Sequence, residues 1–389
     1  MIRFLAIALC LLAAVPAGAE EPAWAPAAVV NGAPYQSVEE LRSFYKLTPV
    51  AKVSRKGAYG LSLGDLTLEL GPGNREMRIG GLLVVLERPL QKDTAGQLLI
   101  SREDWVKWVD PILRPTYIPG RAPVRTVVID PAHGGPDEGT PSSYVKEADA
   151  TLQVALRLQE ELEKMGLQVI LTRTGDYFLS DRQRVDAANA AESAIFLTLH
   201  LNSGRSDYRG SQVYTVAAPE PGAAAAAGNA HDAAQSALAY ALQSALVSTA
   251  GAADGGCAGA HYSLLSSITC PAVWVELGYA THAQEGAALA GAAYQEALAR
   301  ALARGIATYA HVVDPATSIP VQQPRTTTTP KAPTPAKQPT KTPAKAADTP
   351  RTTRSSAAAS TTARRRTQPQ QAKPQAQPAR QPATRRSRR

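Results

Sequence analysis

Four side chains have the types and positions from which a hydrolytic site could be built. His133, His200 and Glu276 each stand at or just after the end of an expected strand, and Glu147 begins an expected helix. Enzymes with alternating strands and helices place their sites at the carboxyl ends of strands. Two histidines and one glutamate are a frequent ligand set for catalytic zinc, and hydrolysis then needs a further carboxylate as general base. The coincidence of all four residues predicts metal-assisted chemistry.

Each of these residues alone has an ordinary structural explanation. A lone histidine after a strand is usually a hydrogen-bonded loop residue, and a glutamate that opens a helix favours the helix dipole. Glu276 is less ordinary, because a carboxylate at the tip of the apolar run Pro271 to Val275 is costly to bury unless it is paired or used. The remaining histidines lack partners at ligand-like spacing and are expected to be structural; they are His231, His261, His282 and His311.

Two further polar residues near these positions receive structural interpretations. Asp130 is expected to hydrogen-bond the backbone or a metal-bound imidazole. Tyr279 is expected to belong to the core or to a groove wall. Neither residue is therefore predicted to be catalytic.

The elements that must position these residues alternate between strands and helices from residue 125 to residue 310. Apolar residues recur at helical spacing from Leu152 to Met165, and Gly166 follows where a helix C-cap would lie. The expected strands are Thr126 to Ile129, Gln168 to Leu171, Ala194 to Leu199, Ser211 to Val216 and Ala272 to Glu276. The other expected helices are Asp181 to Ala191, Asp232 to Ser248 and Gln284 to Ala310. The fold class is therefore α/β, with a twisted, mostly parallel or mixed sheet flanked by helices.

A smaller β-rich module precedes this domain. Residues 24 to 118 contain short alternating runs separated by glycine and proline, with helices expected at Ser37 to Tyr45 and Ser101 to Val109. No cluster of histidine, cysteine or paired acids occurs in it, so we expect binding or structural support from it. Pro111 to Pro123, with four prolines, is the expected linker to a catalytic domain at residues 125 to 312.

The first 19 residues have the composition of a signal peptide. Arg3 is followed by an apolar run from Phe4 to Val15 and by Ala17-Gly18-Ala19, a typical cleavage site. The apolar run is too short to span a bilayer, and no later segment is longer, so no transmembrane segment is expected. Cys10 lies inside the apolar run and not at its end, which argues against lipidation. We expect export across the inner membrane to the periplasm or cell envelope.

The two cysteines that follow the signal segment leave two alternatives open. Cys257 and Cys270 could form a disulfide that closes a short loop in an oxidising compartment. They could equally be two small buried hydrophobic side chains.

Charge is distributed unevenly along the 389 residues. The total is +8, but Pro315 to Arg389 has sixteen Lys or Arg against one acid, a net charge of +15 that leaves −7 for the rest. Residues 315 to 389 are rich in Pro, Thr, Lys and Arg and almost lack large apolar residues, so we expect a disordered basic tail. Outside the cytoplasm its partners would be anionic envelope polymers or lipid head groups, and nucleic acid is not expected. A plain solvated tail is the alternative.

Several motifs, taken in order, are similar to those of the zinc-dependent N-acetylmuramoyl-L-alanine amidases. The opening strand, Pro, His and Gly-Gly pattern corresponds to Ile129 to Asp137, and the ligand glutamate to Glu147. The later motifs correspond to Thr172-Arg173 with Arg184 and Ala188-Asn189, to Thr198 through Asn202, and to Pro271 through Tyr279. The resemblance covers essentially all of residues 125 to 310.

The resemblance implies a role for each candidate. His133, Glu147 and His200 would hold Zn²⁺, and Glu276 would be the catalytic carboxylate. The implied reaction is hydrolysis of the amide bond between N-acetylmuramic acid and L-alanine in peptidoglycan, for remodelling or separation of the cell wall. His and Glu ligands also accept other divalent metals.

The sequence departs from the family pattern in three places. Ala132 replaces a glycine, which is tolerable only if its φ is negative. The run from Gly255 to Ala258 lacks two basic residues that could contact an acidic stem peptide, and His282 replaces Asn. None of these changes removes a predicted ligand or base.

Two alternatives to the amidase prediction remain. One is a non-catalytic peptidoglycan-binding scaffold with an amidase-like fold. The other is a zinc peptidase that cuts within the stem peptide. Bound metal with turnover would exclude the scaffold, and the chemical ends of the products would distinguish the two hydrolases.

Overall fold

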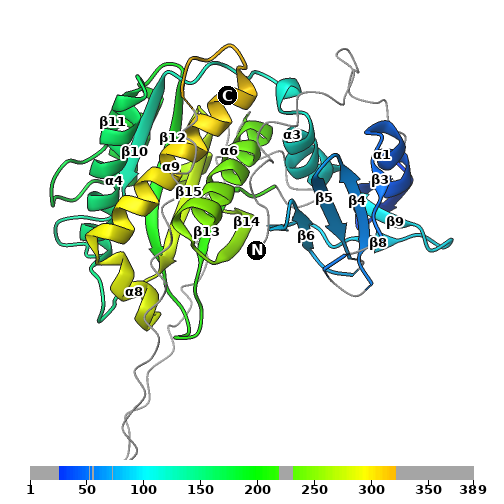
Figure 1. Cartoon of the computed structure of the whole chain (residues 1–389), viewed down its shortest axis with the longest axis horizontal. Helices are drawn as coiled ribbons and strands as arrows, with labels where there is room; N and C mark the ends of the chain where they lie inside the picture. Colours follow the sequence, from blue (N-terminus) through cyan, green and yellow to red (C-terminus); the bar gives the residue numbers. More distant parts are fainter. Residues whose placement is uncertain (1–25, 52, 55–56, 72, 219–230, 321–389) are drawn as a thin grey trace, which may run out of the picture. The chain divides into compact units, whose positions relative to one another are not determined.

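A computed structural model describes residues 26–51, 53–54, 57–71, 73–218 and 231–320 (Figure 1). The expected signal peptide, and the expected tail from residue 321 onward, lie outside the described residues. The predictions for both segments therefore stay predictions. No helix in the described ranges has both the length and the apolar composition required to cross a lipid bilayer.

An extended mixed sheet forms the centre of the fold. Its strand order is β11-β10-β12-β15-β13-β14-β7-β6-β5-β4-β3. Strands β11, β10, β12 and β15 run parallel, and β13 runs antiparallel to β15. The strands of its first half are β10 (Thr126–Pro131), β11 (Gln168–Leu171), β12 (Ala194–Asn202), β13 (Ser211–Val216), β14 (Asp254–Ala260) and β15 (Ala272–Tyr279).

Helices cover both faces of this half of the sheet. Residues Val127 and Ile129 of β10 pack in one core with α4, α6 and α9, whereas Val128 packs in a second core with α5 and α7. This division follows from the alternation of side chains along a strand. The helices are α4 (Glu147–Lys164), α5 (Asp181–Asn189), α6 (Asp232–Ala245), η4 (Leu246–Ala250), α7 (Ser263–Ser266), α8 (Ala283–Leu289) and α9 (Ala292–Val313). The predicted α/β class is confirmed.

The β-rich N-terminal region is also present. Strands β3 (Thr48–Pro49), β4 (Tyr59–Leu63), β5 (Leu66–Leu70), β6 (Glu76–Ile79) and β7 (Leu82–Val85) continue the large sheet. A separate sheet contains β1 (Ala28–Val30), β2 (Ala33–Ser37), β9 (Leu98–Ser101) and β8 (Gln91–Lys92). The helical elements here are α1 (Val38–Phe44), α2 (Arg102–Asp104), η2 (Trp105–Val109), α3 (Asp110–Leu113) and η3 (Pro115–Tyr117).

Local sequence signals explain several of these boundaries. Ser180 caps α5 through a capping box with Gln183. Gly166 follows α4 with a φ of +84°, the left-handed conformation in which a helix commonly ends. The apolar stripe of α4 is buried, as its helical spacing predicted.

The structure corrects five of the expectations for individual elements. The final helix is two helices, α8 and α9, separated at Ala290 and Gly291. Strand β14 was not predicted, because three of its seven residues are glycine. Strands β12 and β15 both extend three residues beyond their predicted ends. The expected linker begins as helix α3, in which Pro111 sits at the first turn, where its missing N–H is not needed.

The two cysteines are present as thiols, with no bridge between them. Cys257 lies fully buried in β14, and Cys270 is half-buried just before β15. Of the two alternatives, the structure therefore agrees with unbridged side chains.

Candidate active site

The structure brings His133, Glu147 and His200 into one cluster. His133 lies in the turn after β10, Glu147 is the first residue of α4, and His200 lies near the end of β12. One ligand atom from each residue lies within 4.8 Å of the others. The Oε1 atom of Glu147 is 3.2 Å from Nε2 of His133 and 3.2 Å from Nδ1 of His200.

These separations agree with a shared metal ion. Two ligand atoms at the usual zinc distance in a tetrahedral site lie about 3.3 Å apart. The donor set, two imidazoles and one carboxylate, also leaves a position for water, as catalytic sites require. The three residues therefore fit a divalent metal.

The turn that presents His133 has an unusual backbone. His133 has a φ of +63°, and Gly134 and Gly135 also have positive φ. Such a conformation is strained for a residue with a side chain, and strain of this kind concentrates at functional sites. Ala132 is not among the described non-glycine residues with positive φ, so the departure from glycine at this position is tolerated.

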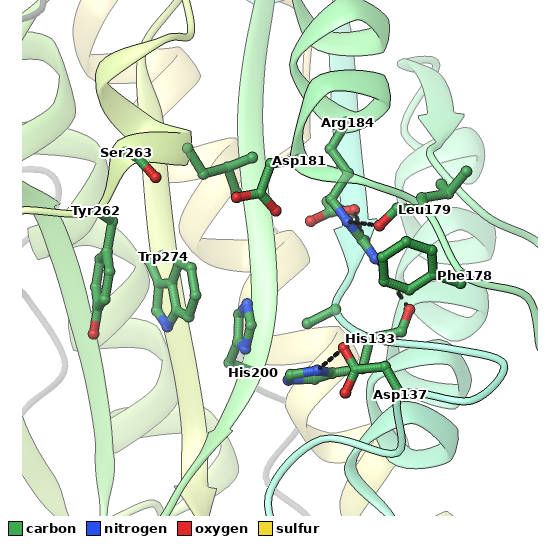
Figure 2. Close-up of a pocket in the computed structure, with 13 residues that line it drawn as sticks. His133, Asp137, Phe178, Leu179, Asp181, Arg184, His200, Tyr262, Ser263 and Trp274 are labelled. Atoms are coloured by element: carbon green, nitrogen blue, oxygen red, sulfur yellow. Dashed lines mark hydrogen bonds and ion pairs between the residues drawn. The ribbon is translucent and has the colours of Figure 1, made fainter. Parts of the chain in front are cut away.

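Hydrogen bonds orient the cluster. The Nδ1–H of His133 donates to Oδ2 of Asp137 at 2.8 Å, which leaves Nε2 for a metal (Figure 2). Backbone N–H groups of Leu201 and Thr140 donate to the two oxygens of Glu147, at 2.8 and 2.7 Å. The ligand atoms are therefore held before any metal binds.

The pKa values within the cluster follow from burial and mutual charge. Burial opposes ionisation of Glu147, but hydrogen bonds and charge from His133 and His200 lower the pKa of that carboxyl well below its usual range. Burial also opposes protonation of His133, but Glu147 and Asp137 raise its pKa to about 8. Burial lowers the pKa of His200. The cluster thus keeps an anionic carboxylate ligand at neutral pH.

Glu276 lies beside the cluster, on the strand that neighbours His200. Strands β12 and β15 are parallel, with His200 and Glu276 directly paired in the register. Trp274 Nε1–H donates to Glu276 Oε1 at 2.7 Å, whereas Oε2 is buried and finds no hydrogen-bond partner among the described residues. Burial raises the pKa of Glu276 to about 7. The arrangement suits a proton acceptor near neutral pH.

The interpretation of Asp130 was wrong. Among the residues that the structure describes, its carboxylate bonds neither the backbone nor an imidazole. It pairs with Arg184 and accepts hydrogen bonds from the hydroxyls of Thr172 and Thr198. Because Arg184 is buried on α5, Asp130 joins β10 to that helix.

A cavity of about 290 Å³ opens over the two histidines. It lies on the face of the sheet that α5 and α7 cover, and Figure 2 shows His133, His200 and Trp274 along its floor. Phe178 and Asp181 line it near α5, and Tyr262 and Ser263 line it near α7. The imidazoles of His133 and His200 are therefore open to a molecule in the cavity.

Three residues that support this site had no role predicted from the sequence, although all three lie within the motifs quoted for the family. Asp137 orients His133, Trp274 bonds Glu276, and the fully buried Arg173 donates to the carbonyls of Pro131, Ala132 and Ala148. Period-2 alternation could have placed Trp274 on the same face as Glu276, two residues away. The four other histidines lie outside the cluster, and His282 instead caps α8.

The fold and the site together define an α/β enzyme domain in which three residues that could hold a metal ion lie beside a further carboxylate. Residues 127–308 match the family described as N-acetylmuramoyl-L-alanine amidase. The chain is 30% identical over 185 residues to YqiI of Bacillus subtilis, an uncharacterized protein, and this match covers 48% of the chain and 84% of YqiI.

Two further similarities concern named amidases. The chain is 30% identical to the N-acetylmuramoyl-L-alanine amidase LytC of Bacillus subtilis, over 47% of the chain but 35% of LytC, about a third of that relative's length. The solved structure of an N-acetylmuramoyl-L-alanine amidase from Clostridium difficile 630 has 29% identity and a TM-score of 0.43. It covers 48% of this chain and 97% of the solved one.

The chain belongs to the N-acetylmuramoyl-L-alanine amidase family. This confirms the resemblance that the motifs predicted, and with it the prediction of an enzyme of this class. The match lies in the C-terminal part of the described residues, and the β-rich N-terminal region precedes it.

Proposed function

We propose that this protein hydrolyses the amide bond between N-acetylmuramic acid and L-alanine in peptidoglycan. Family membership supports the reaction class. The observation that supports catalysis most directly is the His133–Glu147–His200 cluster beside the unpartnered Oε2 of Glu276. Zn²⁺ is the proposed metal, because two neutral imidazoles and a carboxylate are a common ligand set for catalytic zinc.

The proposed mechanism divides the work between metal and protein. A divalent ion held by the three ligands would supply a Lewis acid that activates water near neutral pH. Glu276 accepts the proton of the attacking water through Oε2 and donates it to the departing alanine nitrogen. The Nε1–H of Trp274 donates a hydrogen bond to the other oxygen of this carboxylate, Oε1. The carboxylate thus acts first as base and then as acid.

The proposed setting is the cell envelope. The predicted signal peptide of residues 1 to 19 would direct export, and the +15 charge of residues 315 to 389 would favour anionic envelope polymers or lipid head groups. We propose peptidoglycan as the main partner and the periplasm or cell envelope as the location.

Digestion of purified peptidoglycan sacculi tests the function. The mature protein would be incubated with and without a chelator, and the released fragments analysed by mass spectrometry. Free stem peptides that begin with L-alanine, lost on chelation and restored by zinc, are expected. Intact sacculi that sediment the protein would overturn the proposal in favour of a binding scaffold. Glycan that still has alanine on its lactyl groups would instead indicate a peptidase.

A further inference from the structure

Trp274 lies between two aromatic rings of the site. Its indole stacks on the imidazole of His200, with centroids 3.5 Å apart and planes 10° from parallel. The ring of Tyr262 stacks on the other side, at 4.1 Å and 15°. Figure 2 shows Tyr262, Trp274 and His200 in succession across the floor of the cavity. The indole plane is therefore held from both sides.

The fixed ring aims its one polar group at Glu276. Trp274 and Glu276 are two residues apart on β15, so their side chains leave the same face of the sheet. The indole Nε1–H donates to Oε1 at 2.7 Å, a short distance for a bond to a carboxylate. The other oxygen, Oε2, is buried and has no hydrogen-bond partner within the part of the chain described here.

The two oxygens of Glu276 therefore differ: Oε1 accepts a hydrogen bond from Trp274, and Oε2 accepts none from the described residues. We propose that Trp274 is a positioning residue that holds Glu276 by Oε1 and thereby leaves Oε2 oriented to accept the proton of the attacking water. This inference rests on the proposed amidase function. Without the indole N–H, the three side-chain torsions of Glu276 would be free to turn either oxygen away from the reacting water.

The decisive variant is Trp274→Phe, which retains an aromatic ring beside His200 but removes the N–H donor. Kinetics would be measured on soluble peptidoglycan fragments with the zinc-loaded full chain. We expect kcat to fall about tenfold, with KM and zinc content nearly unchanged, since the lost bond is one to a charged group. If Trp274 only filled space, its replacement by Phe would not lower kcat while zinc content stayed unchanged.

Trp108→Phe is the matched control. Trp108 is fully buried, and its Nε1 has no hydrogen-bond partner among the described residues, so this substitution removes an indole that does not bond a catalytic group. Its kcat should equal that of the wild type when the protein is folded. Circular dichroism would verify folding of each variant.

A second variant keeps the test decisive if Trp274→Phe does not fold. Tyr262→Leu removes the outer stacking ring but leaves the N–H donor, and a smaller loss of kcat, about threefold, is expected. Unchanged kcat in a folded, zinc-loaded Trp274→Phe protein would overturn the inference. Loss of zinc in proportion to activity would also overturn it, because Trp274 would then support His200 and not Glu276. Absence of chelator-sensitive amidase activity in the wild type would instead refute the proposed function.

Discussion

Glu147 lies between two imidazoles, and this placement explains how a buried carboxylate stays ionised. Its side chain is almost completely buried, yet two backbone N–H groups and both histidines surround its oxygens. Desolvation alone would favour the neutral acid, and the hydrogen bonds outweigh it. The same contacts hold the carboxylate oxygens of Glu147 where they could bind the proposed metal.

Removal of the proposed base should separate catalysis from metal binding. Glu276→Gln preserves an acceptor for the Trp274 N–H but cannot take a proton. We expect kcat to fall about 10²- to 10⁴-fold while zinc content stays near that of the wild type. Turnover of soluble peptidoglycan fragments and elemental analysis would measure the two effects.

Glu192→Gln provides a matched control for this change. Glu192 is exposed in the turn before β12, away from the residues that line the cavity. The control should retain full activity. A Glu276→Gln protein as active as this control would contradict the assignment of the base.

Asp137→Asn should weaken metal binding. The substitution replaces the carboxylate that accepts the Nδ1–H of His133 with an amide. The imidazole is then less firmly oriented, and its Nε2 is a weaker metal ligand. We expect zinc affinity to fall about 10- to 100-fold, measured by competition with a chromogenic chelator. Glu138→Gln, at the exposed neighbouring position, should leave the affinity unchanged. Equal affinities for the two variants would contradict this role of Asp137.

At the scale of elements, buried polar contacts determine how helices and strands meet around the site. Arg184 of α5 reaches Asp130 of β10. Arg173 donates to the carbonyl of Ala132, just before His133, and to that of Ala148 in α4. A buried ion pair of this kind costs desolvation, and its hydrogen bonds with Thr172 and Thr198 offset part of that cost. These contacts hold the turn that presents His133.

Gly256→Ala tests the junction between β14 and β7. Gly256 has a φ of +92°, and an added Cβ would lie 2.9 Å from the carbonyl oxygen of Leu83. We expect the free energy of unfolding to fall by about 2 to 5 kcal/mol, through backbone strain and overpacking together. Urea denaturation would measure it.

Gly64→Ala is the control that measures the cost of backbone strain without overpacking. Gly64 has a φ of +58° but nothing within 4 Å of the added Cβ. Its cost should be about 1 kcal/mol. Equal costs at the two positions would show that the contact with Leu83 does not restrict the junction.

Asp104→Asn should alter how stability depends on pH. Asp104 accepts backbone N–H bonds from Glu87 and Arg88, and burial raises its pKa from 3.8 to about 6. A raised folded-state pKa gives stability that is present below about pH 4 and is lost as the pH rises through 6. Relative to Asp104→Asn, the wild type should lose roughly 3 kcal/mol of unfolding free energy between pH 4 and pH 7. A difference that does not vary with pH would contradict this.

At the scale of the whole molecule, one sheet connects the N-terminal region to the family-matched region. Strand β7 pairs with β14, and Leu83 N–H donates to Asp254 across this junction. Lys107 forms a buried ion pair with Glu87 and also donates to the carbonyl of Val216. The division into modules at residues 24 to 118 and 125 to 312 stays a prediction, but these contacts favour structural support as one role of the N-terminal region.

A chain shortened to residues 120–320 tests that role. The truncation would leave β14 at the edge of the sheet, paired with β13 alone. It would also expose the side of α6 that η2 and α3 contact. We expect the midpoint of thermal unfolding to fall by about 10 °C or more, with aggregation visible on size-exclusion chromatography. An unchanged midpoint and a monomeric profile would show that the N-terminal region folds without stabilising the rest.

The sequence alone was sufficient for those features that depend on local pattern. Apolar runs and helical spacing predicted the α/β class, and most strands and helices began within a residue or two of their predicted positions, because period and capping are local properties. Motif order predicted the family. The sequence also predicted the four residues of the proposed site. The structure brings three of them, His133, Glu147 and His200, into one cluster.

Only the tertiary structure decided the features that depend on contacts distant in sequence. Strand β14 contains three glycines and has weak strand propensity, so its pairing with β13 and β7 had to specify it. The partners of Asp130 lie 42 to 68 residues away in the sequence. Period-2 alternation places Trp274 on the same face as Glu276, but only the structure shows that its indole stacks on the ring of His200 from the neighbouring strand β12. Propensity and periodicity describe a residue's own segment, whereas hydrogen-bond direction and burial are set by segments that meet only when the chain folds.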